Sequence, residues 1–220
     1  MNTIIKMLLG GLALIASLPV DASILVNIVI EGNISITDYD FNKEKEAISS
    51  FVNMSNTIAR SQLEDHPKKF IVAVNFFGGK DDYRGIEFVN GNNRLEVKSA
   101  AVWMARFFHP KYSGNAIYDA IQNGNADLIL KERTLPLQYR KVLVVVTNSL
   151  DADSTTEAKN YVAKYYTKPS HEIFLYMIGV GSDGKRSINQ FKGIADKILA
   201  IDNFNALEDA IKAITSLSAD

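Results

Sequence analysis

Long apolar runs along the chain alternate with segments whose apolar residues recur every three or four positions. The runs at 24–30, 70–77 and 141–148 are apolar almost throughout, which is typical of strands covered on both faces. Segment 85–90 follows the turn-rich stretch GGKDDYRG, so we expect it to form an antiparallel edge strand. Six strands are predicted, at residues 24–30, 70–77, 85–90, 141–148, 172–180 and 198–202.

Between these strands, apolar residues recur at the spacing typical of helices. In the first interval Ile48, Phe51 and Val52 lie on one stripe. Helices are predicted at residues 42–62, 95–107, 114–123, 126–133, 154–166 and 187–197, and from Asn203 onward. Strands that alternate with helices predict an α/β fold with three αβα layers, which is Rossmann-like. Its open, mostly parallel sheet of six strands has one antiparallel edge.

The composition narrows the class of protein. The 220 residues carry a net charge of -1, which argues against nucleic acid or an acidic lipid surface as the main partner. The chain has no cysteine, which excludes disulfides and thiolate metal sites.

Residues 1–22 have the pattern of a secretory signal peptide: Lys6, an apolar run from Met7 to Leu18, and small residues before Ser23. The run is shorter than the roughly 18 residues that span a bilayer, and we see no later membrane span in the mature chain. We therefore expect an exported domain at 23–220, periplasmic in a bacterium or else secreted or surface-associated.

Polar residues gather where the predicted strands end. Segments 31–35, 111–116 and 147–153 read EGNIS, KYSGNA and TNSLDAD. In open α/β sheets, ligands bind outside the carboxyl ends of the strands. These three segments are therefore expected to meet at one crevice.

The same segments resemble the metal-ion-dependent adhesion site of the von Willebrand factor A (vWA) family. That site uses D-x-S-x-S after the first strand, a threonine from a loop written G-G-T-A-I-G-D-A-I, and the aspartate of T-D-G. This chain has EGNIS, SGNAIYDAI at 113–121 and TNS at the matching places, in the same order. The resemblance implies a vWA-type fold over the mature chain and a role in binding another protein rather than in catalysis.

Carried over by position, the resemblance implies five site residues: Glu31, Asn33, Ser35, Asn115 and Asn148. Only Ser35 keeps the family's residue type, and one carboxylate remains where the family has two. Mg²⁺ or Mn²⁺ prefers charged oxygen ligands at about 2.0–2.1 Å. We therefore interpret the site as a degenerate one without a metal, and Glu31 with Ser35 as the ligands if a metal does bind.

Three nearby residues, Ser113, Asp151 and Asp153, are expected to support this site. The partner is expected to be a protein, within a cell-envelope assembly such as a secretion or pilus system.

An alternative lies in the segment IGVGSDGK. Gly179, Gly181 and Gly184 match G-x-G-x-x-G after a strand, and Lys185 nearly completes a phosphate-binding loop. This pattern indicates a nucleotide-binding protein or enzyme. The motif follows the penultimate strand, however, whereas a dinucleotide-binding fold opens with it.

Overall fold

The computed structural model describes residues 23–61, 70–91, 93–107, 109–136 and 138–216. The predicted signal peptide at 1–22 lies outside these residues. Among the described helices, none is long and apolar enough to cross a membrane.

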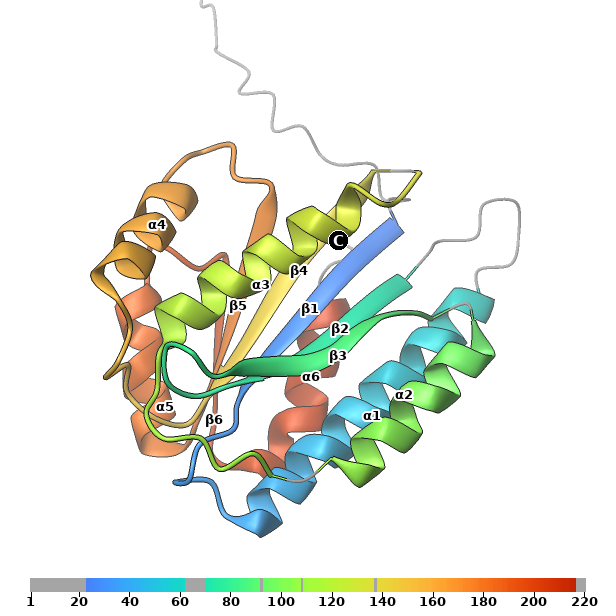
Figure 1. The fold of residues 1–220 in the computed structure, drawn as a ribbon, viewed down its shortest axis with the longest axis horizontal. Coiled ribbons are helices and arrows are strands. Elements are labelled where there is room, and N and C mark those ends of the chain that lie inside the picture. Colours follow the sequence, from blue (N-terminus) through green and yellow to red (C-terminus); the bar gives the residue numbers. More distant parts are fainter. Residues whose placement is uncertain (1–22, 62–69, 92, 108, 137, 217–220) are drawn as a thin grey trace, which may run out of the picture.

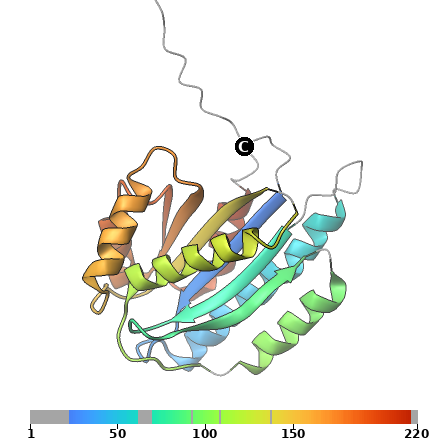
Figure 2. The same ribbon diagram turned by 45° about the horizontal axis from the view of Figure 1, so that its top comes forward.

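Six strands form one sheet: β1 (Ser23–Glu31), β2 (Phe70–Phe77), β3 (Tyr83–Asn90), β4 (Tyr139–Thr147), β5 (Ile173–Val180) and β6 (Lys197–Ile201). Their order is β3-β2-β1-β4-β5-β6, and only β3 runs antiparallel to its neighbour. The predicted open sheet with one antiparallel edge strand is therefore confirmed (Figure 2).

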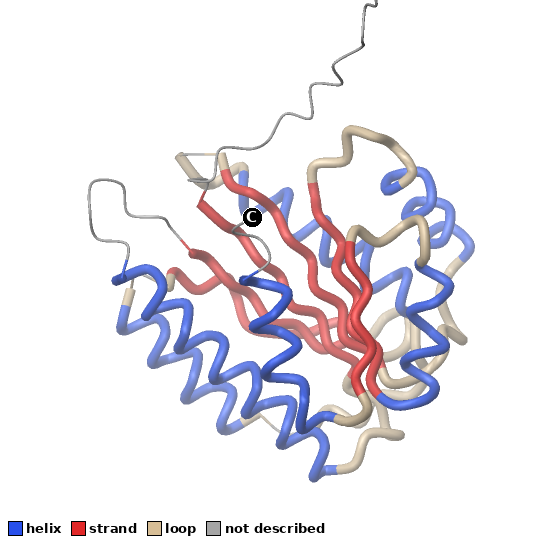
Figure 3. Tube along the Cα trace, turned by 180° about the vertical axis from the view of Figure 1, so that it is seen from behind, coloured by secondary structure: helices blue, strands red, loops and turns tan. Residues whose placement is uncertain are grey.

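Helices cover both faces of this sheet (Figures 1 and 3). The helices are α1 (Asp38–Ser61), α2 (Arg94–Arg106), α3 (Ile117–Glu132), α4 (Thr156–Tyr166), α5 (Gly181–Ile188) and α6 (Leu207–Ser216). Short 3₁₀ turns, η1 (Asn189–Phe191) and η2 (Phe204–Ala206), follow α5 and precede α6. In β1, Val26, Ile28 and Ile30 pack with α1, α2 and α6, while Leu25 and Val29 pack with α3, α4 and the α5–η1 segment. The alternation of side chains along a strand divides the apolar run between two cores.

The predicted helices at 114–123 and 126–133 are one continuous helix, α3. Gly124, which separates them in the sequence, lies buried inside this helix. A Cβ atom at this position would come within 2.6 Å of Leu143 Cδ1. The glycine therefore lets the helix approach the sheet closely and does not end it.

The prediction of a helix at 187–197 was wrong in its position, because α5 already begins at Gly181. A Cβ atom at Gly179 would come within 2.4 Å of the Gly184 carbonyl oxygen, so these two glycines bring helix and strand into contact. Gly181 has φ 69°, which favours glycine, and Lys185 Nζ contacts Asp202 Oδ1 at 2.5 Å. The glycine pattern thus has a packing explanation, which removes the main support for a nucleotide site.

Gly184→Ala tests that explanation. The new Cβ atom would lie 2.4 Å from the Thr147 carbonyl oxygen, which is backbone and cannot turn away. We expect a loss of about 1–3 kcal/mol in the free energy of unfolding, although alanine is the better helix former. Thermal unfolding measures this loss, with the exposed Ser182→Ala in the same helix as the control. An unchanged or raised midpoint would contradict the packing role.

Candidate functional site

Three loops meet at the carboxyl ends of β1 and β4, toward the lower left in Figure 1. The loop after β1 pairs with the segment before α3, because Ile34 N donates to the Tyr112 carbonyl and Tyr112 N donates to the Gly32 carbonyl, both at 3.0 Å. The Asn115 carbonyl accepts from Ala152 N at 2.9 Å and so joins that segment to the loop after β4. The convergence expected from the strand ends is therefore present.

The carboxylate of Glu31 lies at the centre of this junction and is 1% exposed. Its Oε2 accepts from Thr147 Oγ1 at 2.6 Å, from Asn148 N at 2.9 Å and from Ser149 N at 3.2 Å. Its Oε1 accepts from the Asn33 amide and the Ser149 hydroxyl. Burial raises the pKa of Glu31, and these hydrogen bonds to the charged form oppose the rise.

Ser149 connects all three loops. Its hydroxyl donates to Glu31 and accepts from Asn33 Nδ2 at 3.3 Å and from Asn115 Nδ2 at 2.9 Å. A serine hydroxyl offers one donor and two acceptor positions, so its capacity is filled. Sequence reasoning missed Ser149 because it assigned the site position to the preceding residue, Asn148.

Asn33 and Ser35 form a local turn instead of a shared ligand set with Glu31. Asn33 Oδ1 accepts from Ser35 N at 2.8 Å and from Ser35 Oγ at 2.5 Å. An asparagine commonly caps the backbone two residues ahead in this way. The turn directs the Ser35 hydroxyl to Asn33, and it leaves Ile34 68% exposed at the surface.

His109, which sequence reasoning missed, lies between α1 and the turn at residues 33–35 and contacts both. Its ring stacks on Phe41 with centroids 4.5 Å apart, and its Nε2 lies 3.0 Å from the Asn33 carbonyl oxygen. Its Nδ1 lies 3.2 Å from Asp38 Oδ1 at the start of α1. The first loop is therefore held against α1 by an aromatic contact as well as by polar ones.

The expected supporting aspartates fix loop backbones and do not turn toward Glu31. Asp153 Oδ2 accepts from Asn115 N at 2.8 Å. Asp151 Oδ1 accepts from Ile117 N at 3.0 Å, and its Oδ2 pairs with Lys159 Nζ at 3.0 Å. Ser113 is exposed.

Two amide oxygens at the site, Asn115 Oδ1 and Asn148 Oδ1, are buried and have no hydrogen-bond partner among the described residues. Asn148 reaches Glu31 through its backbone N–H only. The cluster thus holds spare acceptor capacity on neutral oxygens, whereas its one carboxylate is already occupied.

These residues do not fit a hard divalent cation such as Mg²⁺ or Mn²⁺. Such an ion needs available charged oxygens in octahedral geometry, and both oxygens of Glu31 face N–H and O–H donors. Within the described part of the chain, no group of three or more histidine, aspartate or glutamate side chains could hold a metal ion. The donors around Glu31 instead satisfy its charge, and the two free amide oxygens of Asn115 and Asn148 are neutral.

A second carboxyl group, Glu44 in α1, lies buried nearby and was also missed. It is fully buried, and neither carboxyl oxygen has a hydrogen-bond partner within the described residues. Burial raises its pKa well above the ordinary value, and repulsion from Glu31 and Asp40 adds to the rise. Glu44 therefore favours its protonated form.

Both the sequence and the fold match one family of known proteins. Residues 26–213 match the family model of the von Willebrand factor type A domain. The chain therefore belongs to the vWA family. No curated protein sequence matches it.

Solved structures show the same fold at low sequence identity. A von Willebrand factor type A protein from Catenulispora acidiphila has a TM-score of 0.62 at 14% identity, over 90% of this chain and 43% of that one. Proximal thread matrix protein 1 from the mussel byssus, with zinc in its MIDAS motif, has a TM-score of 0.69 at 12% identity. The match covers 90% of this chain and 48% of that one. A pilus adhesin from Lactobacillus rhamnosus GG has a TM-score of 0.61 at 10% identity, and the match covers 90% of this chain and 30% of that one. The chain thus spans less than half the length of each.

We expect millimolar Mg²⁺ or Mn²⁺ to leave the thermal unfolding midpoint unchanged. A ligand at 100 times its dissociation constant would stabilise the folded state by about 2.7 kcal/mol, which such a measurement detects readily. Glu31→Gln is the diagnostic variant because it keeps the shape and removes the charge. An upward shift in the original protein that disappears in Glu31→Gln would show that a cation displaces the donors around Glu31.

Glu44→Met is expected to stabilise the protein at neutral pH. A buried polar group without a partner costs about 1–3 kcal/mol, and methionine fills similar space. Because the pKa of Glu44 is raised on folding, its presence costs most above its ordinary value of 4.5, where the unfolded chain ionises. The gain in the free energy of unfolding should therefore shrink as pH falls from the raised pKa of folded Glu44 toward 4.5.

The exposed Glu46→Met in the same helix is the control and should change the free energy of unfolding by less than about 0.5 kcal/mol. Equal effects of the two changes, or a gain from Glu44→Met that is the same at every pH, would contradict the conclusion that Glu44 is a buried carboxyl group with a raised pKa.

Proposed function

We propose that this vWA domain is an interaction module that binds a protein partner with the loops at the carboxyl end of its sheet, without a metal and without catalysis. One observation carries the proposal. Around the buried carboxylate of Glu31, whose hydrogen bonds are made within the protein, the loops expose two large apolar side chains, Ile34 at 68% and Leu150 at 39%.

Ile34 and Leu150 belong to one rigid surface although they lie far apart in the sequence. Asn33, next to Ile34, donates to the Ser149 hydroxyl, next to Leu150. The Leu150 carbonyl accepts from Asn115 Nδ2 at 3.0 Å. Apolar side chains held on a fixed surface lose little entropy on binding, and this favours a protein partner.

A groove of about 400 Å³ continues this surface along the segment before α3. It is lined by Arg84, Trp103, Arg106, Phe107, His109, Pro110 and Tyr112. Trp103 stacks on Phe107 with ring centroids 4.4 Å apart, and Arg84 and Arg106 are exposed beside them. Aromatic and arginine side chains are enriched at protein interfaces. An acidic partner residue next to an apolar one would complement this groove.

The absence of catalysis is proposed from the state of Glu31. A carboxylate that acts as a general base needs a free oxygen within reach of a substrate proton. Here five donors occupy both oxygens, and the side chain is 1% exposed. Glu31 is suited to holding loops in place.

We further propose that the protein is exported and acts in a cell-envelope assembly. The signal-peptide pattern at residues 1–22 supports export. Two proteins of similar fold are described as a pilus adhesin and as a thread matrix protein of the mussel byssus. A periplasmic or surface location is consistent with both observations.

Site-specific photocrosslinking in the producing cells tests the partner surface. A crosslinker at position 34 and another at position 150 should capture the same protein, because both positions belong to one surface. A crosslinker at Leu95, which is 76% exposed at the start of α2, is the matched control. The captured protein is then purified for binding measurements.

Ile34→Ser combined with Leu150→Ser should weaken that binding at least tenfold, since central apolar anchors contribute about 2 kcal/mol or more each. The thermal midpoint should stay nearly constant because both side chains are exposed. Leu95→Ser should leave binding unchanged. Capture of one protein at Leu95 but at neither loop position would contradict the proposed surface.

A further inference from the structure

Two asparagines interrupt the apolar strands at the centre of the sheet. Asn27 lies in the middle of β1 and is fully buried, and Asn75 lies in β2 and is 7% exposed. Asn27 occupies the position between Leu25 and Val29 on the α3 side of the sheet. Burying an amide there costs free energy unless its hydrogen bonds are made.

Hydrogen bonds link these amides to a tyrosine and an aspartate. Asn75 Nδ2 donates to Asn27 Oδ1 at 2.9 Å, and Asn27 Nδ2 lies 3.3 Å from the Tyr83 hydroxyl. The Tyr83 hydroxyl donates to Asp127 Oδ2 at 2.8 Å, and Asn27 Nδ2 reaches the same oxygen at 3.5 Å. The network leads from the buried sheet outward to a carboxylate on α3.

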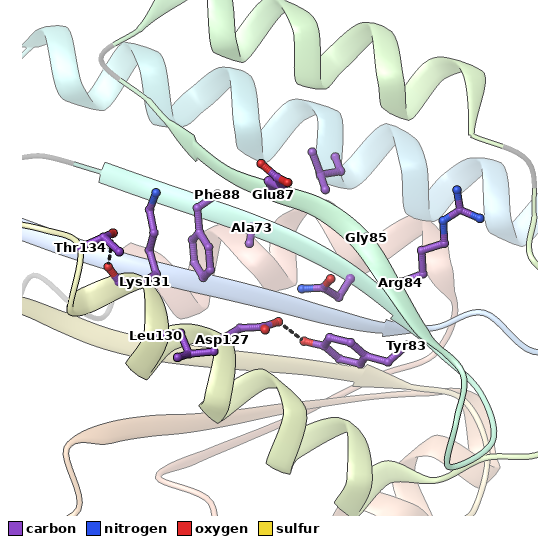
Figure 4. Close-up of a pocket in the computed structure, with 12 residues that line it drawn as sticks. Ala73, Tyr83, Arg84, Gly85, Glu87, Phe88, Asp127, Leu130, Lys131 and Thr134 are labelled. Carbon is purple, nitrogen blue, oxygen red and sulfur yellow. Dashed lines mark hydrogen bonds between the residues drawn. The ribbon is translucent and has the colours of Figure 1, made fainter.

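This carboxylate opens into a groove of about 480 Å³ between α3 and β3, shown in Figure 4. Tyr83 and Phe88 extend from β3 toward α3, and Arg84 and Glu87 point away from it. Between the two rings lies Gly85, where a Cβ atom would come within 2.4 Å of Asn75 Oδ1. The groove thus has a polar floor between two aromatic walls, and its volume falls within the range of about 300–1,000 Å³ typical of small-molecule sites.

Two opposite charges face this groove without neutralising each other. Asp127 and Lys131 are separated by one turn of α3, the spacing at which such residues usually pair. Within the described residues, neither forms an ion pair. Lys131 Nζ instead lies 5.9 Å from the centre of the Phe88 ring, and Asp127 Oδ1 accepts no hydrogen bond from the part of the chain that the structure describes.

We propose that this groove binds a small zwitterion of the amino-acid class. The ligand's ammonium group contacts Asp127, its carboxylate contacts Lys131, and its apolar part lies against Phe88 and Leu130. Burial raises the pKa of Asp127 and so disfavours its charged form, and the ammonium group of a ligand would stabilise that form. Leu130 is 57% exposed beside the groove and would be covered by the ligand's side chain.

The proposed ligand explains features that the partner surface does not need. Asp127 and Lys131 lie on α3, where Asp127 contacts Tyr83 and Lys131 lies beside Phe88. Two buried asparagines are an unfavourable way to fill a core, but they hold Tyr83 and Asp127 in fixed positions from beneath. Gly85 lets β3 lie close to Asn75, since a Cβ atom there would come within 1.9 Å of the Val74 carbonyl oxygen.

Three matched probes test the charges separately. L-phenylalanine carries both charges, 2-phenylethylamine only the ammonium group, and 3-phenylpropionate only the carboxylate. Titrations followed by amide NMR shifts should show that phenylalanine binds most tightly and shifts residues of α3 and β3. Asp127→Asn and Lys131→Gln should each weaken phenylalanine binding about tenfold or more, because each removes one charge-assisted contact.

Asp81→Asn and Arg133→Gln, both exposed, repeat the same charge changes outside the groove and should leave binding unchanged. 2-Phenylethylamine should respond to Asp127→Asn and not to Lys131→Gln. The proposal is overturned if phenylalanine fails to bind at millimolar concentration, or if either singly charged probe binds as tightly. Binding unaffected by both groove variants in a folded protein would overturn it as well.

Discussion

The buried carboxylate of Glu31 is the interaction on which the loops at the carboxyl end of the sheet depend. A charge removed from water needs donors around it, and here the last residue of β4 and the loop after it supply two backbone N–H groups and two hydroxyls. This arrangement places Ser149 between Asn33 and Asn115 and turns Ile34 and Leu150 outward. Glutamate is one methylene longer than the aspartate of the family's motif, and its carboxylate accepts hydrogen bonds directly from Thr147, Asn148 and Ser149. Hydrogen-bond donors of the protein thereby surround the carboxylate oxygens that a cation would need as ligands.

The sheet was predictable because its strands are apolar runs, and all six strands appear in the predicted order along the chain. The helices were harder to place, since glycine can end a helix or allow close packing. Gly124 and Gly184 both pack against the sheet, and only the distance to a neighbouring strand distinguishes the two roles. The sequence also indicated which loops meet. It did not reveal that Ser149, rather than Asn148, faces Glu31, because a one-residue choice within a turn depends on backbone direction.

Buried polar groups account for what sequence patterns missed. Glu44, Asn27 and Asn75 each occupy a position where the surrounding pattern calls for an apolar residue. Glu44 lies at helical spacing between Phe41 and Ile48, but it is a charged residue between two lysines, and such a residue is ordinarily read as exposed. The two asparagines give a signal only when β1 and β2 are known to be neighbours, because their side chains then meet on one face. Such groups lower stability, and protein cores usually keep them where a site needs fixed polar atoms.

Glu31 and Asn27 lie four residues apart in β1, on the same face of one strand, and so join the partner surface to the groove beside α3. The turn before β3 provides a second connection, since the Gly78 carbonyl accepts from Ala116 N at 2.7 Å and Tyr83 follows a few residues later. Physical continuity alone does not couple two sites. Coupling requires an element with two arrangements that the two ligands favour differently. Strand β1 is hydrogen-bonded on both sides along its length and offers one arrangement. A ligand in the groove would therefore stabilise the domain as a whole, while affinity for the partner would change only if the turn at residues 78–82 shifted with it.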